Sequence, residues 1–328
     1  MKWGQICVLI VSVLTVLTGC GQLPTNCPPE CSEITLRRGN LPNTDLTGAN
    51  LAGASILDSN LRGASIAGAN LAGANLSGTN LIASDLSQAN FSGANLREVN
   101  FSGANLDGAN LSGADLSGAI LTRVDLTNVN LNAVVLDNAR LIGASLWGTN
   151  LRGVQFVGTD LRGVNLVGAD LSGANLGSAS ARLSGANLSG ADLRGIRLDG
   201  ASLVSTNLAG TNLSRAQMSG INSMGAVLAG ADMSRVNLTG TRFFDSGLSG
   251  VSLTYADLSQ VEIDQTQLNG AQLYGTNLET AIITFDGNPE DFAAFNGAHY
   301  DSQTLWPAQF LVPVGVVFDD EQAAIPNQ

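Results

Sequence analysis

The chain has 328 residues, of which 44% are hydrophobic and 13% charged, and its formal net charge at pH 7 is −12. This charge argues against a nucleic acid partner, because binding to phosphates requires a basic surface. After residue 20 no apolar run approaches the ~18 residues of a transmembrane helix, which argues against a helical membrane protein.

The segment 1–19 is predicted to be a lipoprotein signal peptide. Lys2 precedes an apolar run over residues 6–17, and the run leads into LTGC, whose last residue is Cys20. This tetrapeptide resembles the bacterial lipobox, and the resemblance implies that Cys20 is acylated and becomes the first residue of the mature chain. The sequence therefore predicts a protein of the cell envelope, lipid-anchored to a membrane and periplasmic or outward-facing. The alternative is an uncleaved membrane anchor, for which the apolar run is short.

The next segment, residues 20–35, is predicted to form a short tether. It contains Cys27 and Cys31, the two thiols that remain once the signal peptide is removed and Cys20 is acylated. Two thiols in an oxidising compartment are expected to form a disulfide. The alternative is half of a metal site, but such sites normally need four ligands, and the only histidine, His299, lies near the other end of the chain. We therefore predict a disulfide, no metal and no cofactor.

Residues 36–283 repeat a pattern of five residues. A large apolar residue, position i, recurs every fifth residue, and the register shifts once by two residues, around residues 178–182. Position i−2 is small or β-branched, position i−1 is usually Asn or Asp, and position i+2 holds 30 of the 39 glycines. This period matches neither the turn of an α-helix, which takes about 3.6 residues, nor the simple alternation of side chains along a β-strand.

Such a repeat predicts a β-solenoid. Residues i−2 and i are two apart, so both point inward in an extended segment, while the polar residue at i−1 points outward. Residues i+1 and i+2 form a corner, where Gly tolerates a positive φ. Four corners close a coil of 20 residues, and successive coils stack at roughly 4.8 Å, the spacing between strands. Residues 36–283 therefore predict about 12 coils and a rod of roughly 60 Å.

The pattern, seen in stretches such as ANLAGANLSGTNL at residues 69–81, resembles the A(D/N)LXX repeat of the pentapeptide-repeat family over about three quarters of the chain. This resemblance implies an all-β fold, the right-handed quadrilateral β-helix. Some cytoplasmic members of the family mimic DNA and bind type II topoisomerases such as gyrase with an acidic rod, which is the alternative function. Two features weigh against it, namely the export signal and the net charge of only −4 in residues 36–283.

Residues 284–328 are predicted to be an acidic, aromatic C-terminal cap. They carry seven acidic residues and no Lys or Arg, and five of the ten Phe residues lie there. An open solenoid end exposes a strand edge and its core, and a terminal cap is the usual remedy. The alternative is a homodimer interface formed by the same aromatic residues.

The sequence predicts no catalytic residues. Acid–base and nucleophilic chemistry commonly uses a histidine, but His299 stands alone, and the serines and aspartates mostly occupy repeat positions. We therefore predict a non-enzymatic structural or binding module, tethered to the membrane by its lipid. Its predicted partner is an unknown protein or an anionic ligand of the envelope.

One face of the coils gathers arginine and tyrosine. Centres 193, 213, 233, 253 and 273 lie one coil apart, and their corner residues form a predicted binding face: Arg194, Arg215, Arg235, Tyr255 and Tyr274. Exposed clusters of arginine and aromatic residues are typical of binding surfaces. The alternative is coincidence among 14 arginines, because a looser file lies on a face of the first segment: Arg62, Arg123, Arg140 and Arg162.

Overall fold

The structure is a computed structural model that describes residues 32, 34–176, 182–284, 295–308, 310–313 and 315–319. The predicted signal peptide and the residues Cys20, Cys27 and Cys31 lie outside this part of the chain. The chain forms two compact units, Met1–Ser145 and Leu146–Gln328. The named elements are all β-strands, and no helix in the described residues is long and apolar enough to span a bilayer.

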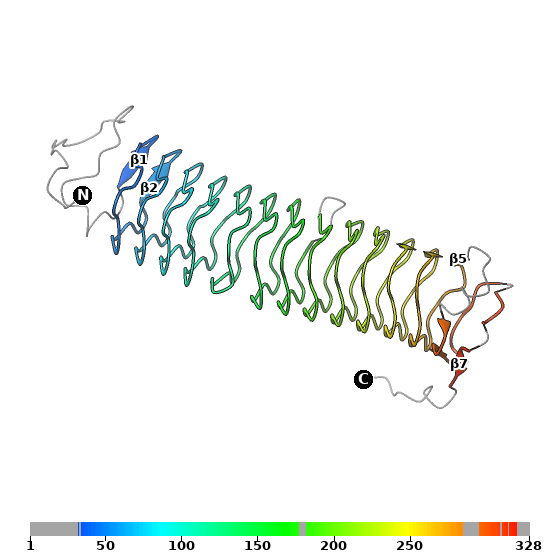
Figure 1. Ribbon diagram of the computed structural model, residues 1–328. Helices are drawn as coiled ribbons and strands as arrows, with labels where there is room; N and C mark the ends of the chain where they lie inside the picture. The colour runs from blue at the N-terminus through cyan, green and yellow to red at the C-terminus, as the bar shows by residue number, and fades with distance from the viewer. Residues whose placement is uncertain are drawn as a thin grey trace, which may run out of the picture. The chain divides into compact units, whose positions relative to one another are not determined.

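The first unit is a stack of four-sided coils, seen at the blue and cyan end of the ribbon (Figure 1). Strand β1 (Thr35–Arg37) pairs in parallel with β2 (Ser55–Leu57), so that Leu36 lies opposite Ile56. Further along the chain, residues four repeats apart are joined by single parallel bridges, and these bridges form continuous lines such as Asn50, Asn70, Asn90, Asn110 and Asn130. The predicted coil of four repeats is therefore confirmed in this unit.

The second unit contains coils of the same kind. Strands β3 (Arg242–Phe244), β4 (Glu262–Asp264) and β5 (Ile282–Thr284) form a parallel three-stranded sheet in that order. Across the register shift Asp160 pairs with Arg182, so the coil between these two residues is longer by the two inserted residues. The next coil, from Arg182 to Ser202, has the usual length. The insertion therefore leaves the parallel ladder intact on both sides of the shift.

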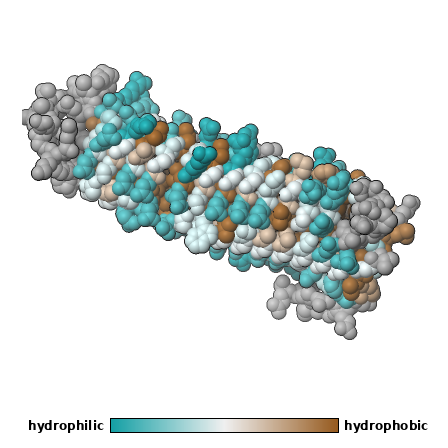
Figure 2. Space-filling view, viewed as in Figure 1, coloured by the Kyte–Doolittle hydropathy of each residue, from teal (hydrophilic) through white to brown (hydrophobic). Residues whose placement is uncertain are grey.

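Large apolar residues fill the centre of the coils, as predicted. Leu106 is 1% exposed and lies one coil away from Leu86 and Leu126, which are buried as well. Each such leucine stabilises the fold by about 2 kcal/mol through the removal of its side chain from water. On the visible outer face, apolar residues occur as separate spots among polar ones (Figure 2). The hydrophobic residues of the repeat are thus mainly used inside the coils.

Buried hydroxyl groups at position i−2 find partners in the backbone. Thr79 is fully buried and donates to the carbonyl of Ile56 in the preceding coil at 2.6 Å. Thr276 makes the equivalent bond to the carbonyl of Leu253 at 2.8 Å. These hydrogen bonds offset the cost of burying a polar group, which explains why Thr and Ser can replace Ala at this position.

The corners have the backbone conformation that the glycine pattern predicts. Position i+2 has a positive φ at all 30 of its glycines, between 59° and 73°. At sixteen further corners a residue other than Gly holds the same conformation, with φ between 48° and 60°. The coil therefore imposes the conformation, and glycine is the residue that adopts it with the least strain.

The preference for Asn and Asp at position i−1 has a cause that the sequence pattern did not reveal. The side-chain oxygen accepts a hydrogen bond from the backbone N–H two residues later, as Asn110 does from Ser112 at 3.1 Å. The amide group also donates to the preceding coil, as Asn110 does to Asn90 at 3.1 Å. Position i−1 therefore helps to form the turn, in addition to being polar and outward-facing.

The described part of residues 295–319, which we call the closing segment, follows β5 in the second unit. Phe295 occupies a core position and is 1% exposed. Strand β6 (His299–Tyr300) continues the ladder from Gln272, and β7 (Val317–Phe318) pairs with β6 in parallel. The rings that pack around these strands are Phe295, Tyr300, Trp306, Phe310 and Phe318. The closing segment thus adds further rungs and an aromatic cluster to the last coil.

Candidate functional site

The predicted binding face divides into two lines of residues at the same corner. Arg215, Arg235 and Tyr255 occupy position i+2 of three successive coils, with φ of 60°, 56° and 56°. The backbone N–H of Arg235 donates to the carbonyl of Thr254 in the next coil at 2.9 Å, and the other two residues repeat this bond. Arg194 and Tyr274 instead occupy position i+1. We call Arg215, Arg235 and Tyr255 the corner line.

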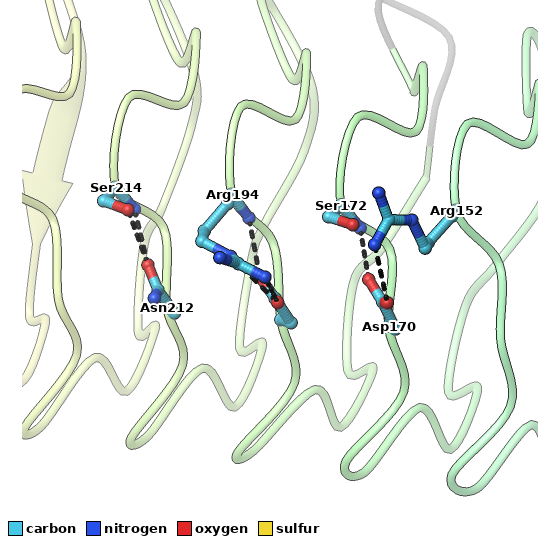
Figure 3. Close-up of polar contacts among 7 residues, drawn as sticks. Arg152, Asp170, Ser172, Arg194, Asn212 and Ser214 are labelled. Atoms are coloured by element: carbon cyan, nitrogen blue, oxygen red, sulfur yellow. Dashed lines mark hydrogen bonds and ion pairs between the residues drawn. The ribbon is translucent and has the colours of Figure 1, made fainter.

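Arg194 turns back onto its own coil (Figure 3). Its Nε donates to both carboxylate oxygens of Asp192 at 2.9 Å, and the two side chains form an ion pair. The hydrogen bond from Arg194 holds the pKa of Asp192 below its ordinary value, and the same bond raises the pKa of Arg194. Arg152 instead points toward Asp170 on the next coil, with Nη1 4.0 Å from Oδ2 (Figure 3). The charge of Arg194 is therefore balanced within the protein.

Tyr274 is tied to the closing segment. Its hydroxyl donates to Oδ2 of Asp319 at 3.0 Å, and the same oxygen bonds to Nδ1 of His299. Burial and the hydrogen bond to Asp319 raise the pKa of Tyr274 to about 12. The hydrogen bonds from His299 and Tyr274 lower the pKa of Asp319. Tyr274 thus holds the last described residues against the coil.

The corner line keeps its functional groups at the surface. Arg215 and Arg235 are exposed, and neither forms an ion pair with any residue that the structure describes. The guanidinium carbon of Arg235 lies 5.9 Å from the centroid of the half-buried Tyr255 ring, a cation–π contact. The ring also lies against Gly275, where an added Cβ would come within 2.5 Å of two ring carbons. Glycine at 275 therefore provides the space for this ring.

The looser arginine file does not form a comparable line. Arg62 and Arg162 stand at position i+1, Arg123 at i+2 and Arg140 at i−1. Arg162 binds the carboxylate of Asp160 through two side-chain hydrogen bonds, at 2.8 and 2.7 Å. Arg123 is exposed and has a φ of 59°, the conformation of the corner line. It therefore provides a matched control for substitutions in the corner line.

The charge of the chain changes sign close to the corner line. Residues 182–242 carry six arginines and three aspartates, whereas residues 243–328 carry twelve acidic residues and no Lys or Arg. Because the whole chain has 27 acidic and 15 basic residues, the entire net charge of −12 lies in residues 243–328. This boundary is visible in the sequence, although the sequence analysis missed it. Arg215 and Arg235 belong to the last basic part of the chain.

The described residues contain no group of three His, Cys, Asp or Glu side chains that could hold a metal ion. His299 is engaged with Asp319 in the closing segment. Exposed guanidinium groups bind carboxylates and phosphates through charge-assisted hydrogen bonds. The chemistry that the corner line can perform is therefore the recognition of an anion.

Comparison with protein families identifies the repeat. The family described as Pentapeptide repeats matches in eight copies, and the matched ranges together cover residues 30–132, 139–177 and 181–284, three quarters of the chain. The chain belongs to the pentapeptide-repeat family. Its fold is accordingly the right-handed quadrilateral β-helix that the resemblance implied, and its general role is that of a scaffold. Pentapeptide-repeat proteins are generally structural or binding proteins.

Several solved structures of pentapeptide-repeat proteins are similar to this chain. HetL from Nostoc sp. strain PCC 7120, involved in heterocyst differentiation regulation, is 29% identical over 74% of this chain and 89% of its own, with a TM-score of 0.30. Rfr23 from Cyanothece 51142 is 27% identical, and the match covers 34% of this chain and 86% of Rfr23, with a TM-score of 0.23. QnrB1, a plasmid-mediated fluoroquinolone resistance protein, is 16% identical, and the match covers 87% of this chain and 95% of QnrB1, with a TM-score of 0.21. All three TM-scores are below 0.5, so the family assignment rests on the repeat. No curated protein matches the chain in a sequence search.

Proposed function

We propose that this pentapeptide-repeat protein is a non-enzymatic binding module of the cell envelope, anchored through a lipid on Cys20, which binds an anionic partner along the corner line. The LTGC tetrapeptide that ends at Cys20 supports the anchor. The membership of a family of scaffold proteins supports the role of a binding module. The DNA-mimic alternative gains no support, because the repeat residues 36–283 carry a net charge of only −4.

The observation that carries the binding proposal is the corner line itself. Among the described residues, this is the one place where three successive coils hold a residue other than Gly at the same positive-φ corner. A left-handed conformation costs an ordinary residue roughly 1–2 kcal/mol relative to a right-handed one. Strained residues of this kind cluster at functional sites, where the side chain has a use that outweighs the strain. Here the side chains are two exposed guanidinium groups and an aromatic ring.

The binding proposal is tested by capturing partners from an envelope extract. The variant carries Arg215→Gly and Arg235→Gly, because glycine is the usual residue at these corners and the fold is expected to remain intact. The control carries Arg38→Gly and Arg123→Gly, which remove two exposed arginines at corners with φ of 55° and 59°. We expect the first variant alone to lose the partner. Equal capture by both variants would remove the corner line from the proposal.

The anchor has a separate test. Acylation needs the thiol of Cys20, so Cys20→Ser is expected to abolish labelling by a radioactive fatty acid and to leave an unprocessed precursor. Cys31→Ser serves as the control and is expected to be labelled and processed normally. Normal labelling and processing of the Cys20→Ser protein would contradict the lipid anchor.

A homodimer through the closing segment is a second candidate, favoured by exposed apolar side chains there. Leu311 is 85% exposed, Phe318 52% and Leu305 49%, and Phe318 belongs to the strand β7. An edge strand with such side chains is a template for pairing with another chain. Sedimentation velocity tests this candidate, and Phe318→Lys is expected to convert the dimer into a monomer. A wild-type protein that sediments as a monomer at high concentration would contradict it.

A further inference from the structure

We propose that the corner line binds a second copy of this chain, at the diagonally opposite corner of its coils. The opposite corner presents Met224, Phe244, Asp245 and Asp264, which we call the acidic corner. The inference rests on the proposed function, because it names the anionic partner as the chain itself. It follows from the charges that are unmatched at the two corners and from the apolar side chains beside the acidic ones.

The first step concerns where the two corners lie. Asn212 pairs with Asp232, 20 residues later, and each coil between such partners turns at four corners. Arg235 and Asp245 are ten residues apart, and both have the positive φ of a corner, 56° and 50°. Ten residues are half of a coil, so these two side chains occupy opposite corners. A neighbouring copy can therefore present the acidic corner to the corner line.

The second step concerns the charges of the acidic corner. Asp245 is exposed and Asp264 half-buried, and neither forms an ion pair with any residue that the structure describes. They lie on adjacent coils, because the N–H of Asp245 donates to the carbonyl of Asp264 at 3.2 Å. Glu262 differs, since it is paired with Arg242 at 3.0 Å. The acidic corner thus carries two unmatched carboxylates, as the corner line carries two unmatched guanidinium groups.

The third step concerns the side chains beside these carboxylates. Met224 is 44% exposed and Phe244 40% exposed, and both occupy position i+1 on adjacent coils of the acidic corner. An aromatic face attracts a guanidinium group, and a carboxylate accepts its N–H groups. Phe244 and Asp245 together offer both contacts, and Met224 offers an apolar surface to the stem of an arginine. The acidic corner therefore has the chemistry of an arginine site.

The fourth step concerns access to the arginines. Position i+1 beside Arg215 and Arg235 holds Ser214 and Ser234, which are small and half-buried. The hydroxyl of Ser214 donates to Asn212 at 2.8 Å, toward its own coil (Figure 3). The neighbouring corner position therefore places no long side chain between the two guanidinium groups and an approaching surface.

A second copy is the occupant that fits both corners. The two arginines lie on adjacent coils, as do the two carboxylates, so that two copies can form both ion pairs together through charge-assisted hydrogen bonds. A contact between opposite corners is heterologous, and each added copy leaves one corner of each kind open. A lipid anchor on each copy would raise the effective concentration of this contact in the membrane.

The test is charge reversal with complementation, measured by sedimentation velocity of the full chain in a density-matched neutral detergent. One variant carries Arg215→Glu and Arg235→Glu, so that both of its corners are acidic. The other carries Asp245→Arg and Asp264→Arg, so that both of its corners are basic. Circular dichroism establishes that each variant is folded.

We expect the wild type to form species that grow with concentration, because the contact does not close. Each variant alone is expected to associate roughly tenfold more weakly or worse, since its two corners repel one another. An equimolar mixture of the two variants is expected to recover association, because the acidic corners of one then meet the basic corners of the other. Added salt is expected to weaken association of the wild type.

Two further variants are controls. Arg38→Glu with Arg123→Glu reverses two exposed arginines at corners with φ of 55° and 59°, a conformation that Glu98 also holds, with φ of 59°. This control is expected to associate as the wild type does. Phe318→Lys removes the exposed ring of the closing segment and is expected to leave the growth with concentration unchanged.

The other outcomes overturn the inference. If the wild type remains a monomer, or if the mixture does not recover association, the two corners do not bind each other. If the arginine control or Phe318→Lys abolishes association, the contact lies elsewhere. If the wild type does not associate but a different envelope partner is captured through Arg215 and Arg235, the inference fails and the proposed function stands. If neither a second copy nor another partner depends on these arginines, both fail.

Discussion

The repeated coils and the closing segment provide hydrogen-bond partners for the backbone N–H groups by different means. In the coils each rung binds the equivalent rung of the next coil, as the N–H of Leu71 does with the carbonyl of Asn90 at 2.7 Å. At the last coil the N–H of Gly275 instead donates to Oδ1 of Asp301 at 2.9 Å. A carboxylate thus takes the place of the carbonyl that another coil would supply.

The side chains of the two regions differ in the same way. In the coils a polar side chain commonly bonds within its own turn or to the adjacent coil, as Asn110 does with Ser112 and Asn90. In the closing segment the partners have no fixed spacing in the sequence, and Tyr274 bonds to Asp319, 45 residues away. The coils are therefore stabilised by a rule that each unit repeats, whereas the closing segment depends on individual contacts. Four predictions test this contrast.

The largest effect is expected from a charge in the core of a coil. Leu106→Asp buries a carboxylate without a partner and removes a buried leucine, so it should destabilise the protein by about 4 kcal/mol or more. Ser112→Asp lies at a corner and should change the stability by no more than about 0.5 kcal/mol. Thermal unfolding followed by circular dichroism compares the two. Similar melting temperatures would contradict the difference between centre and corner.

The next largest effect is expected in the closing segment. Asp301 is 2% exposed, and its Oδ1 accepts hydrogen bonds from the N–H groups of Gly275 and Gln303. Asp301→Ala leaves these donors without their acceptor and should cost about 2–3 kcal/mol of local stability. Hydrogen exchange at the Gly275 amide measures this loss. Glu279→Ala removes an exposed carboxylate and is the control. If exchange accelerates equally in both variants, the loss of a negative charge explains the effect and the hydrogen bonds of Asp301 do not.

A smaller effect of opposite sign is expected at a corner of the coils. Ala83 has a φ of 56°, so Ala83→Gly should relieve strain and stabilise the protein by about 0.5–1 kcal/mol. The same change at Ala114, which is fully buried at position i−2, should destabilise it by about 1 kcal/mol. Urea unfolding of both variants checks the signs. A loss of stability in Ala83→Gly would mean that the corner conformation carries no strain.

The smallest effect appears only at high pH. Because the pKa of Tyr274 is raised from 10.0 to about 12, its bond to Asp319 contributes fully below pH 10 and is lost as the pH rises toward 12. An ultraviolet titration of the tyrosines should therefore contain a component near pH 12, and Tyr274→Phe should remove it. Tyr255→Phe is the control. A component that persists in Tyr274→Phe would show that Asp319 does not hold this hydroxyl.

The repeat pattern was sufficient to predict the coil. A period of five places Leu86, Leu106 and Leu126 on one inward file, because side chains two residues apart share a face and the chain turns after each pair. The positive φ at the corners followed from glycine, the residue that adopts it most readily. The pairing of Asn110 with Ser112 did not follow, since a polar residue at i−1 needs only to face outward to satisfy the pattern.

The candidate site was predicted in part, because sequence position specifies a face but not the direction of a long side chain. The five-residue period by itself determined that Arg194, Arg215 and Arg235 share one corner of successive coils. Only the tertiary structure decided that Arg194 turns to Asp192 and that Tyr274 reaches Asp319, whereas Arg215 and Arg235 stay exposed. Positions i+1 and i+2 point differently at a corner, and a partner 45 residues away has no signature in a pattern of five. Each repeat of this sequence determines its own backbone geometry, whereas the contacts of the charged side chains depend on the folded chain as a whole.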